Sequence, residues 1–136
     1  MKVINSEIII ESFNKIEIAD ITSKVEKIVS KNKIEKGLVS IYSKHSTSAI
    51  VINENEVGLI EDFENYLNRI VLEDNYKHNH IDNNARSHIQ SFLLGNSISI
   101  PIINSKIDLG TWQSIFFVEL DGPRSRRTIK VNIIGI

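Results

Sequence analysis

The chain contains no cysteine, which excludes disulfides, thiolate nucleophiles and thiolate metal sites. Its formal net charge at pH 7 is −1, so no strong overall field favours nucleic acid or a membrane surface. The N-terminal apolar residues form only a short burst before charged residues follow, unlike a signal peptide or a spanning helix. No repeat or low-complexity segment is present. We therefore expect one soluble, cytoplasmic domain over residues 1–136, without nucleic-acid or membrane partners.

Apolar periodicity predicts strands and helices that alternate along the chain. The predicted strands span residues 3–11, 16–18, 38–43, 49–52, 98–103, 109–119 and 128–134. Predicted helices start near residue 20, near residue 59 and at residue 84, and the last is closed by Gly95. Pro101 indicates an edge or a bulge in its strand. Two local features are also expected: a capping box from Ser23 and Glu26, with Asp20 and Thr22 as competing caps, and a core stripe formed by Leu59, Phe63, Leu67 and Ile70.

The stretch from Leu109 to Arg127 organises the predicted fold. Its apolar block, Ile115 to Val118, favours a strand buried on both faces, and the turn Asp121-Gly122-Pro123 ends it. Three arginines follow this turn. Two-residue spacing places Arg124 and Arg126 on one strand face and Arg127 on the other, where we expect it to tolerate substitution. The residues alone fit both a charged site and a run of solvated arginines.

A second group of polar residues lies between two predicted strands. His45-Ser46-Thr47-Ser48 supplies an imidazole and three hydroxyls, and Asn53-Glu54 follows the next apolar run. Such groups can hold an anion, and a histidine can move a proton near neutral pH. The same hydroxyls can equally serve as local backbone hydrogen-bond partners.

Three histidines lie beside polar residues at the edges of predicted elements. His78 belongs to the polar segment 73–84, whereas Asn84 is the expected N-cap of a helix that carries His88 on the same side. Neutral imidazoles together suit a transition metal. The sequence therefore predicts a divalent-metal site, with zinc or magnesium, at His45, His78 and His88, although a hydrogen-bonded core histidine fits His88 as well.

Several separated motifs together resemble the YjbQ-like family. They occur in order along nearly the whole chain: His45-Ser46-Thr47, Asn53-Glu54, Tyr76-Lys77-His78, Asn84-Ala85-x-x-His88, Leu94-Gly95, Leu109-Gly110-Thr111-Trp112-Gln113 and Glu119-x-Asp121-Gly122-Pro123-Arg124-x-Arg126. The resemblance implies an α+β fold of two packed, mainly antiparallel sheets with about three helices. It also implies a homotrimer with sites near subunit contacts.

The activity implied by this resemblance is a weak, secondary thiamine-phosphate synthase reaction, with a different physiological reaction left open. This transferase joins hydroxymethylpyrimidine diphosphate to thiazole phosphate and releases pyrophosphate. The catalytic candidates are His45, His88, Glu54 and Glu119. The candidates for binding substrate phosphate are Ser46, Thr47, Ser48, Asn84, Gln113, Arg124 and Arg126.

The sequence is also compatible with two other functions. In a metal-dependent hydrolase, the three histidines would hold an ion that activates water, with Glu54 or Glu119 as the base. In a non-catalytic trimer, the same groups would bind a phosphorylated small molecule without turning it over.

Overall fold

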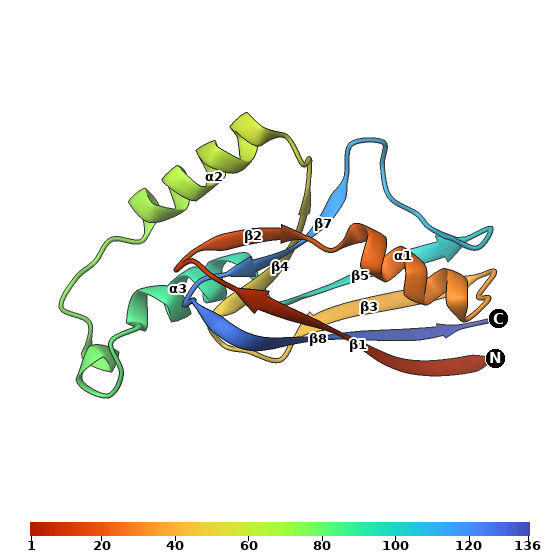
Figure 1. Ribbon diagram of the computed structural model, residues 1–136, viewed down its shortest axis with the longest axis horizontal. Coiled ribbons are helices and arrows are strands. Elements are labelled where there is room, and N and C mark those ends of the chain that lie inside the picture. Colours follow the sequence, from red (N-terminus) through yellow and green to blue (C-terminus); the bar gives the residue numbers. More distant parts are fainter.

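The computed structural model describes residues 1–136 and consists of two antiparallel sheets with three α-helices (Figure 1). The strands are β1 (Lys2–Ser12), β2 (Glu17–Asp20), β3 (Gly37–Ser43), β4 (Ser48–Asn53), β5 (Ser97–Ile103), β6 (Lys106–Ile107), β7 (Ser114–Glu119) and β8 (Arg124–Gly135). The helices are α1 (Thr22–Lys31), α2 (Val57–Ile70) and α3 (Ala85–Leu94), with a 3₁₀ turn η1 (Lys77–His80) before α3. The predicted α+β fold is confirmed.

The larger sheet has the order β1-β8-β3-β5-β6, and the smaller has the order β2-β7-β4. Alternate residues of β8 point into the core, so Ile129, Val131 and Ile133 are buried, as expected for a strand with one solvated face. They pack with apolar residues of the smaller sheet and α1 in one core cluster. Strand β6 pairs only with Ile102 and Ile103 of β5. Pro101 therefore lies in a strand that is almost at the edge, as predicted.

Strand β7 is the central strand of the smaller sheet, between β2 and β4. Its residues from Ile115 to Val118 are all buried, which confirms the predicted two-sided burial. The strand begins later than predicted, because residues 110–113 form a turn in which the Gly110 N–H donates to Gln113 Oε1 (2.8 Å). Trp112 is 73 % exposed in this turn. The sequence pattern therefore placed the start of the strand at Leu109, five residues before the point where β7 begins.

The predicted capping box of α1 does not form. Asp20 Oδ1 instead accepts hydrogen bonds from the Thr22 N–H (2.9 Å) and the Thr22 hydroxyl (2.6 Å). Thr22 Oγ1 in turn accepts the Ile115 N–H (2.8 Å). The competing pair, Asp20 and Thr22, therefore fixes the start of α1 and ties it to β7.

Helix α2 lies outside the two sheets and is joined to the body by extended segments at both ends (Figure 1). Its apolar stripe was predicted to be core, but only Leu67 is buried, while Leu59 and Ile70 are exposed. Its C-terminal end is held by Arg86, which donates to the carbonyls of Asn68 (2.7 Å) and Val71 (2.6 Å). An amphipathic pattern reveals an apolar face without revealing what covers it. None of the helices is long and apolar enough to cross a membrane.

Candidate functional site

Three segments that are distant in the sequence meet at one end of the smaller sheet. They are the β3–β4 loop, the turn between β7 and β8, and the start of α3. The Leu120 N–H donates to the Thr47 carbonyl (3.2 Å), and the Ser87 hydroxyl donates to the Leu120 carbonyl (2.7 Å). The Ser91 hydroxyl donates to the Ser48 carbonyl (2.6 Å). These bonds fix the loop and the turn against α3.

The turn between β7 and β8 packs against the turn between β1 and β2. The Gly122 N–H donates to the Lys15 carbonyl (3.0 Å), and a Cβ at Gly122 would collide with the Asn14 carbonyl oxygen. Only glycine fits this close backbone approach. The contact brings the Lys15 side chain to the predicted site.

A buried ion pair lies beneath this end of the sheet. Glu119 is 0 % exposed and Arg127 is 4 % exposed, and Arg127 Nε donates to Glu119 Oε1 (2.8 Å). Burial acts to raise the pKa of Glu119, but hydrogen bonds from Arg127 and Ser12 outweigh it and lower the pKa. Arg127 also donates to Thr47 Oγ1 (3.0 Å). Glu119 is therefore an ionised internal group that supports the β3–β4 loop.

This geometry argues against two predictions. Glu119 was a candidate base, yet its carboxylate is enclosed and engaged by Arg127 and Ser12. Arg127 was expected to tolerate substitution because it lies opposite Arg124 and Arg126. The opposite face is the protein interior, so the predicted face was right. The burial of Arg127 and its ion pair with Glu119 argue against the predicted tolerance, which stays a prediction.

His45 is held at the start of β8. Its Nε2 accepts the Thr128 N–H (2.8 Å), so the ring proton of the neutral imidazole lies on Nδ1. Burial lowers the pKa of His45, and the positive charge of Arg127 lowers it further. His45 is therefore suited to donate a hydrogen bond through Nδ1, while its Nε2 lone pair is occupied.

The hydroxyls that follow His45 differ in their exposure. Thr47 and Ser48 are buried, and their side chains bond to Arg127 and to the His45 carbonyl, respectively. Ser46 is exposed. Of the three predicted phosphate-binding hydroxyls, only that of Ser46 faces solvent, and the other two stabilise the loop.

A chain of hydrogen bonds connects His78, Asn84 and Asp121. Asn84 Nδ2 donates to Asp121 Oδ2 (2.9 Å), because a carboxylate can only accept. This orientation turns Asn84 Oδ1 toward His78 Nε2 (3.0 Å), so His78 Nε2 must carry a proton. Asn84 occupies the N-cap position of α3 without capping it through its side chain. Asn79 does so instead, by accepting the Ala85 N–H (3.1 Å).

Asp121 is the anionic end of this chain. Lys15 Nζ lies 2.6 Å from its Oδ1, and Arg124 Nη2 lies 2.9 Å from its Oδ2. Burial acts to raise the pKa of Asp121, but the hydrogen bonds from Lys15 and Asn84 prevail and lower it. Arg126 is exposed, as is Arg124. The Arg124 guanidinium is thus paired with a fixed carboxylate, whereas Arg126 has no ion-pair partner in the chain.

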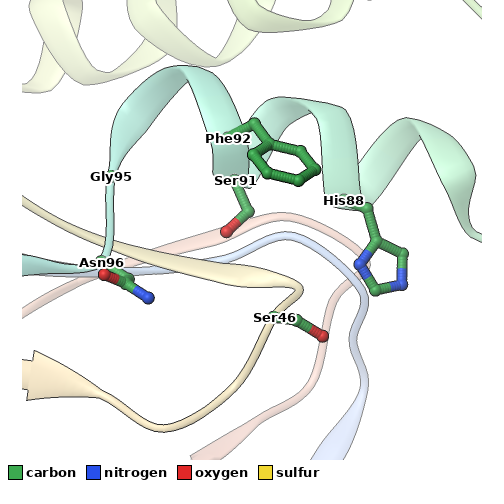
Figure 2. Close-up of a pocket in the computed structure, with 6 residues that line it drawn as sticks. All are labelled: Ser46, His88, Ser91, Phe92, Gly95 and Asn96. Carbon is green, nitrogen blue, oxygen red and sulfur yellow. The ribbon is translucent and has the colours of Figure 1, made fainter.

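His88 borders a cavity of about 250 Å³ between α3 and the β3–β4 loop. Figure 2 shows His88, Ser91 and Phe92 on α3, with Ser46 facing them from the loop and Asn96 at the far end. The rings of His78 and His88 meet edge to face, with centroids 4.7 Å apart. The imidazole nitrogens of His88 have no hydrogen-bond partner in the protein, so they are free to act on a ligand in the cavity.

The predicted set of three metal-binding histidines is not assembled within the chain. His78 and His88 touch, but His45 directs its Nε2 to the Thr128 N–H. No group of three His, Cys, Asp or Glu side chains is arranged to hold a metal ion. The donor geometry of a single chain therefore does not fit the predicted centre, and a bound metal stays a prediction.

Glu54 and Gln113 lie at the opposite end of the smaller sheet from the histidines. Ser48 of β4 pairs with Glu119, whereas Asn53 pairs with Ser114. Five residues of strand correspond to roughly 17 Å. Glu54 follows Asn53, and Gln113 precedes Ser114, so neither side chain belongs to the cavity beside His88.

Sequence reasoning did not select Asp121, Lys15, Ser91, Asn96 or Arg127 as site residues. Ser91 had a usable signal, because it follows His88 by three positions and so shares its helix face. Lys15 had none, since its partner Asp121 lies 106 residues away in the sequence. Arg127 bonds to Glu119, eight residues away, and to Thr47, 80 residues away. Such contacts depend on how the sheets pack.

Comparison with known proteins identifies the family of this chain. The family model for UPF0047 protein YjbQ-like matches residues 6–136. A UPF0047 protein of Methanothermobacter thermautotrophicus is 49% identical over 99% of this chain and 94% of its own length. The UPF0047 protein YugU of Bacillus subtilis is 33% identical over 88% of this chain and 90% of its own length.

Solved structures agree with the fold. A YbjQ-like protein of unknown function from Sulfolobus solfataricus P2 aligns with a TM-score of 0.97 at 43% identity, covering 99% of both chains. A protein of the yjbq/upf0047 family from Clostridium acetobutylicum aligns with a TM-score of 0.88 at 36% identity, covering 95% of this chain and 99% of its own. This chain belongs to the YjbQ-like UPF0047 family.

Proposed function

We propose that the cavity beside His88 binds a phosphorylated small molecule and that the protein has a weak thiamine-phosphate synthase activity. The observation that carries the proposal is the unpaired imidazole of His88, which faces a polar cavity. Arg124 and Arg126 do not line this cavity, but they are exposed on β8 just after the turn that carries Asp121. His88 is half-buried, and neither of its imidazole nitrogens bonds to another group of the protein, so both stay available to a ligand in the cavity.

The proposed reaction displaces pyrophosphate from a carbon atom. The bond between the methylene carbon of hydroxymethylpyrimidine diphosphate and its pyrophosphate oxygen breaks, and a bond from that carbon to the thiazole nitrogen forms. The electron pair leaves with pyrophosphate. Such a reaction needs cationic hydrogen-bond donors where negative charge develops. Arginine is suited to this because its planar fork binds phosphate oxygens in pairs.

The side chains divide into two roles under this proposal. Arg124, Arg126 and the Ser46 hydroxyl hold phosphate oxygens, and the His45 Nδ1–H offers a further donor. His88 exchanges a proton with the departing group or the substrate. His78 packs against His88 and is itself oriented by Asn84 and Asp121, so we regard these three as positioning residues.

Replacing Arg124 or Arg126 by alanine is expected to weaken pyrophosphate binding by about 1.5–3 kcal/mol, or roughly one to two orders of magnitude. Arg124→Lys should weaken binding as well, because an ammonium group lacks the two-donor fork. Isothermal titration of pyrophosphate into each variant measures the effect. Arg69→Ala is the matched control, since Arg69 is exposed on α2 and stacks on Tyr66. Equal affinities across the set would show that Arg124 and Arg126 do not bind pyrophosphate.

The same titration separates the proposed enzyme from a non-catalytic binding protein. If pyrophosphate binds through Arg124 and Arg126 but no substrate pair is turned over, the binding function alone stands. If pyrophosphate does not bind, both functions fail at this cavity.

We also propose that the protein is a homotrimer, as the family resemblance implies. Exposed apolar side chains support an interface close to the cavity, since Phe92 is 88 % exposed and Leu93 is 62 % exposed on α3. Large exposed apolar patches commonly mark protein contacts. Light scattering at micromolar concentration is expected to give three times the mass of the 15.5 kDa chain. A mass of one chain would contradict the proposal.

A further inference from the structure

A second cavity lies between α2 and the smaller sheet and has a volume of about 280 Å³. Its wall includes Glu54, a residue that the histidine site leaves unused. None of its lining residues belongs to the cavity beside His88. The two cavities are therefore separate, and nothing in the proposed reaction explains the second one.

The second cavity is lined mainly by apolar side chains. The sheet contributes Ile18, Val51 and Phe116 from three neighbouring strands. Helix α2 contributes the remaining wall through Leu59, Ile60 and Phe63. Seven of its nine lining residues are hydrophobic, which is the usual composition of a small-molecule site with a few polar groups that fix orientation.

The volume limits the size of an occupant. An apolar cavity of about 150 Å³ accommodates benzene, so a cavity of about 280 Å³ has room for two fused rings with a short side chain. Helix α2 buries only Leu67 along its length. Its fixed points are Glu56, which caps its start, and Arg86, which holds its end. The cavity lies under the N-terminal half of the helix, where Leu59, Ile60 and Phe63 line it.

Glu54 sets the charge of the occupant. It is the one charged residue in the lining, it is half-buried, and its carboxylate has no hydrogen-bond or ion-pair partner in the protein. A partly desolvated carboxylate favours a cationic partner, and a charge-assisted hydrogen bond is stronger than a neutral one. We propose that this cavity binds a compact aromatic ammonium ion, with its rings against Phe63 and Phe116 and its ammonium group on Glu54.

Tryptamine is a suitable probe, and indole-3-propionate carries the same ring system with the opposite charge. Isothermal titration is expected to show saturable binding of tryptamine and much weaker binding of indole-3-propionate. Glu54→Gln should weaken tryptamine binding about tenfold or more, because it removes the charge and keeps the shape. Val51→Phe should abolish binding by filling the cavity.

Two variants serve as controls. Glu61→Gln removes an exposed carboxylate of α2 that does not line the cavity, and His88→Ala alters the other cavity. Both should keep the wild-type affinity for tryptamine. Thermal unfolding of each variant establishes that it is folded, and if Val51→Phe does not fold, Glu54→Gln decides the question.

The proposal is overturned if tryptamine shows no saturable binding at millimolar concentration, which is also the result expected if a second copy of the chain covers this face. It is equally overturned if tryptamine and indole-3-propionate bind alike, or if Glu54→Gln leaves the affinity unchanged. None of these results bears on pyrophosphate binding at the His88 cavity.

Discussion

Replacing Glu119 by glutamine is expected to lower the free energy of unfolding by about 3–5 kcal/mol, a large share of the stability of a small domain. The variant keeps the shape of the side chain but leaves the Arg127 guanidinium buried without a counter-charge. Arg127 is 4 % exposed and cannot reach solvent without disturbing the β3–β4 loop, because it also holds Thr47. Urea denaturation of both proteins measures the difference.

Two matched variants make this prediction specific. Glu7→Gln removes a carboxylate from a partly exposed pair with Lys130, 3.4 Å apart, and should cost less than about 1 kcal/mol. The double variant Glu119→Gln, Arg127→Met removes both buried charges and should recover much of the lost stability. If Glu119→Gln lowers the free energy of unfolding no more than Glu7→Gln does, the buried pair does not stabilise this end of the sheet.

The same carboxylate predicts how stability depends on pH. The folded-state pKa of Glu119 lies below its ordinary value of 4.5, so folding favours the ionised form. This contribution is present above about pH 4.5 and is lost as the pH falls through the folded-state pKa. The acid side of the wild-type stability curve should therefore be steeper than that of Glu119→Gln.

Replacing His88 by alanine is expected to reduce turnover roughly 10²- to 10⁴-fold, the usual contribution of a general acid or base. Its stability should change little, because the ring makes no hydrogen bond that the fold would lose. Steady-state release of pyrophosphate measures the activity, and urea denaturation measures the stability.

His80→Ala is the control for this prediction. His80 is exposed in η1 and lies outside the chain from His78 to Asp121, so its removal should leave both measurements unchanged. If His88→Ala instead unfolds the protein while its folded fraction keeps full activity, His88 is a structural residue.

The sequence predicted most of the fold because its apolar periodicities are strong and local. The alternation of Ile129, Val131 and Ile133 and the apolar block of β7 each specify burial without knowledge of the neighbouring strands. The less accurate predictions concern side chains whose environment depends on the residues that they contact in the folded chain. Arg127 was assigned to the correct face of β8. The pattern did not show that this face is buried, where Arg127 bonds to Glu119 and Thr47.

The candidate site was predictable in part. The β3–β4 loop, His78, Asn84 and His88 do converge. Glu54 was grouped with them because it is close to His45 in the sequence, and Gln113 because it belongs to a motif of the family resemblance. Strand β4 carries Glu54 away from His45 along its length, and β7 brings Glu119, rather than Gln113, to the histidines. Proximity along an extended strand is not proximity in space.

The most direct measurement is pyrophosphate release by the purified protein with hydroxymethylpyrimidine diphosphate and thiazole phosphate. We expect slow, saturable release that requires both substrates. It should fall roughly 10²-fold or more in His88→Ala and should also fall in Arg124→Ala. Release at the rate of a protein-free mixture would contradict the proposed activity. Release that is identical in the wild type and the two variants would show that the reaction takes place elsewhere.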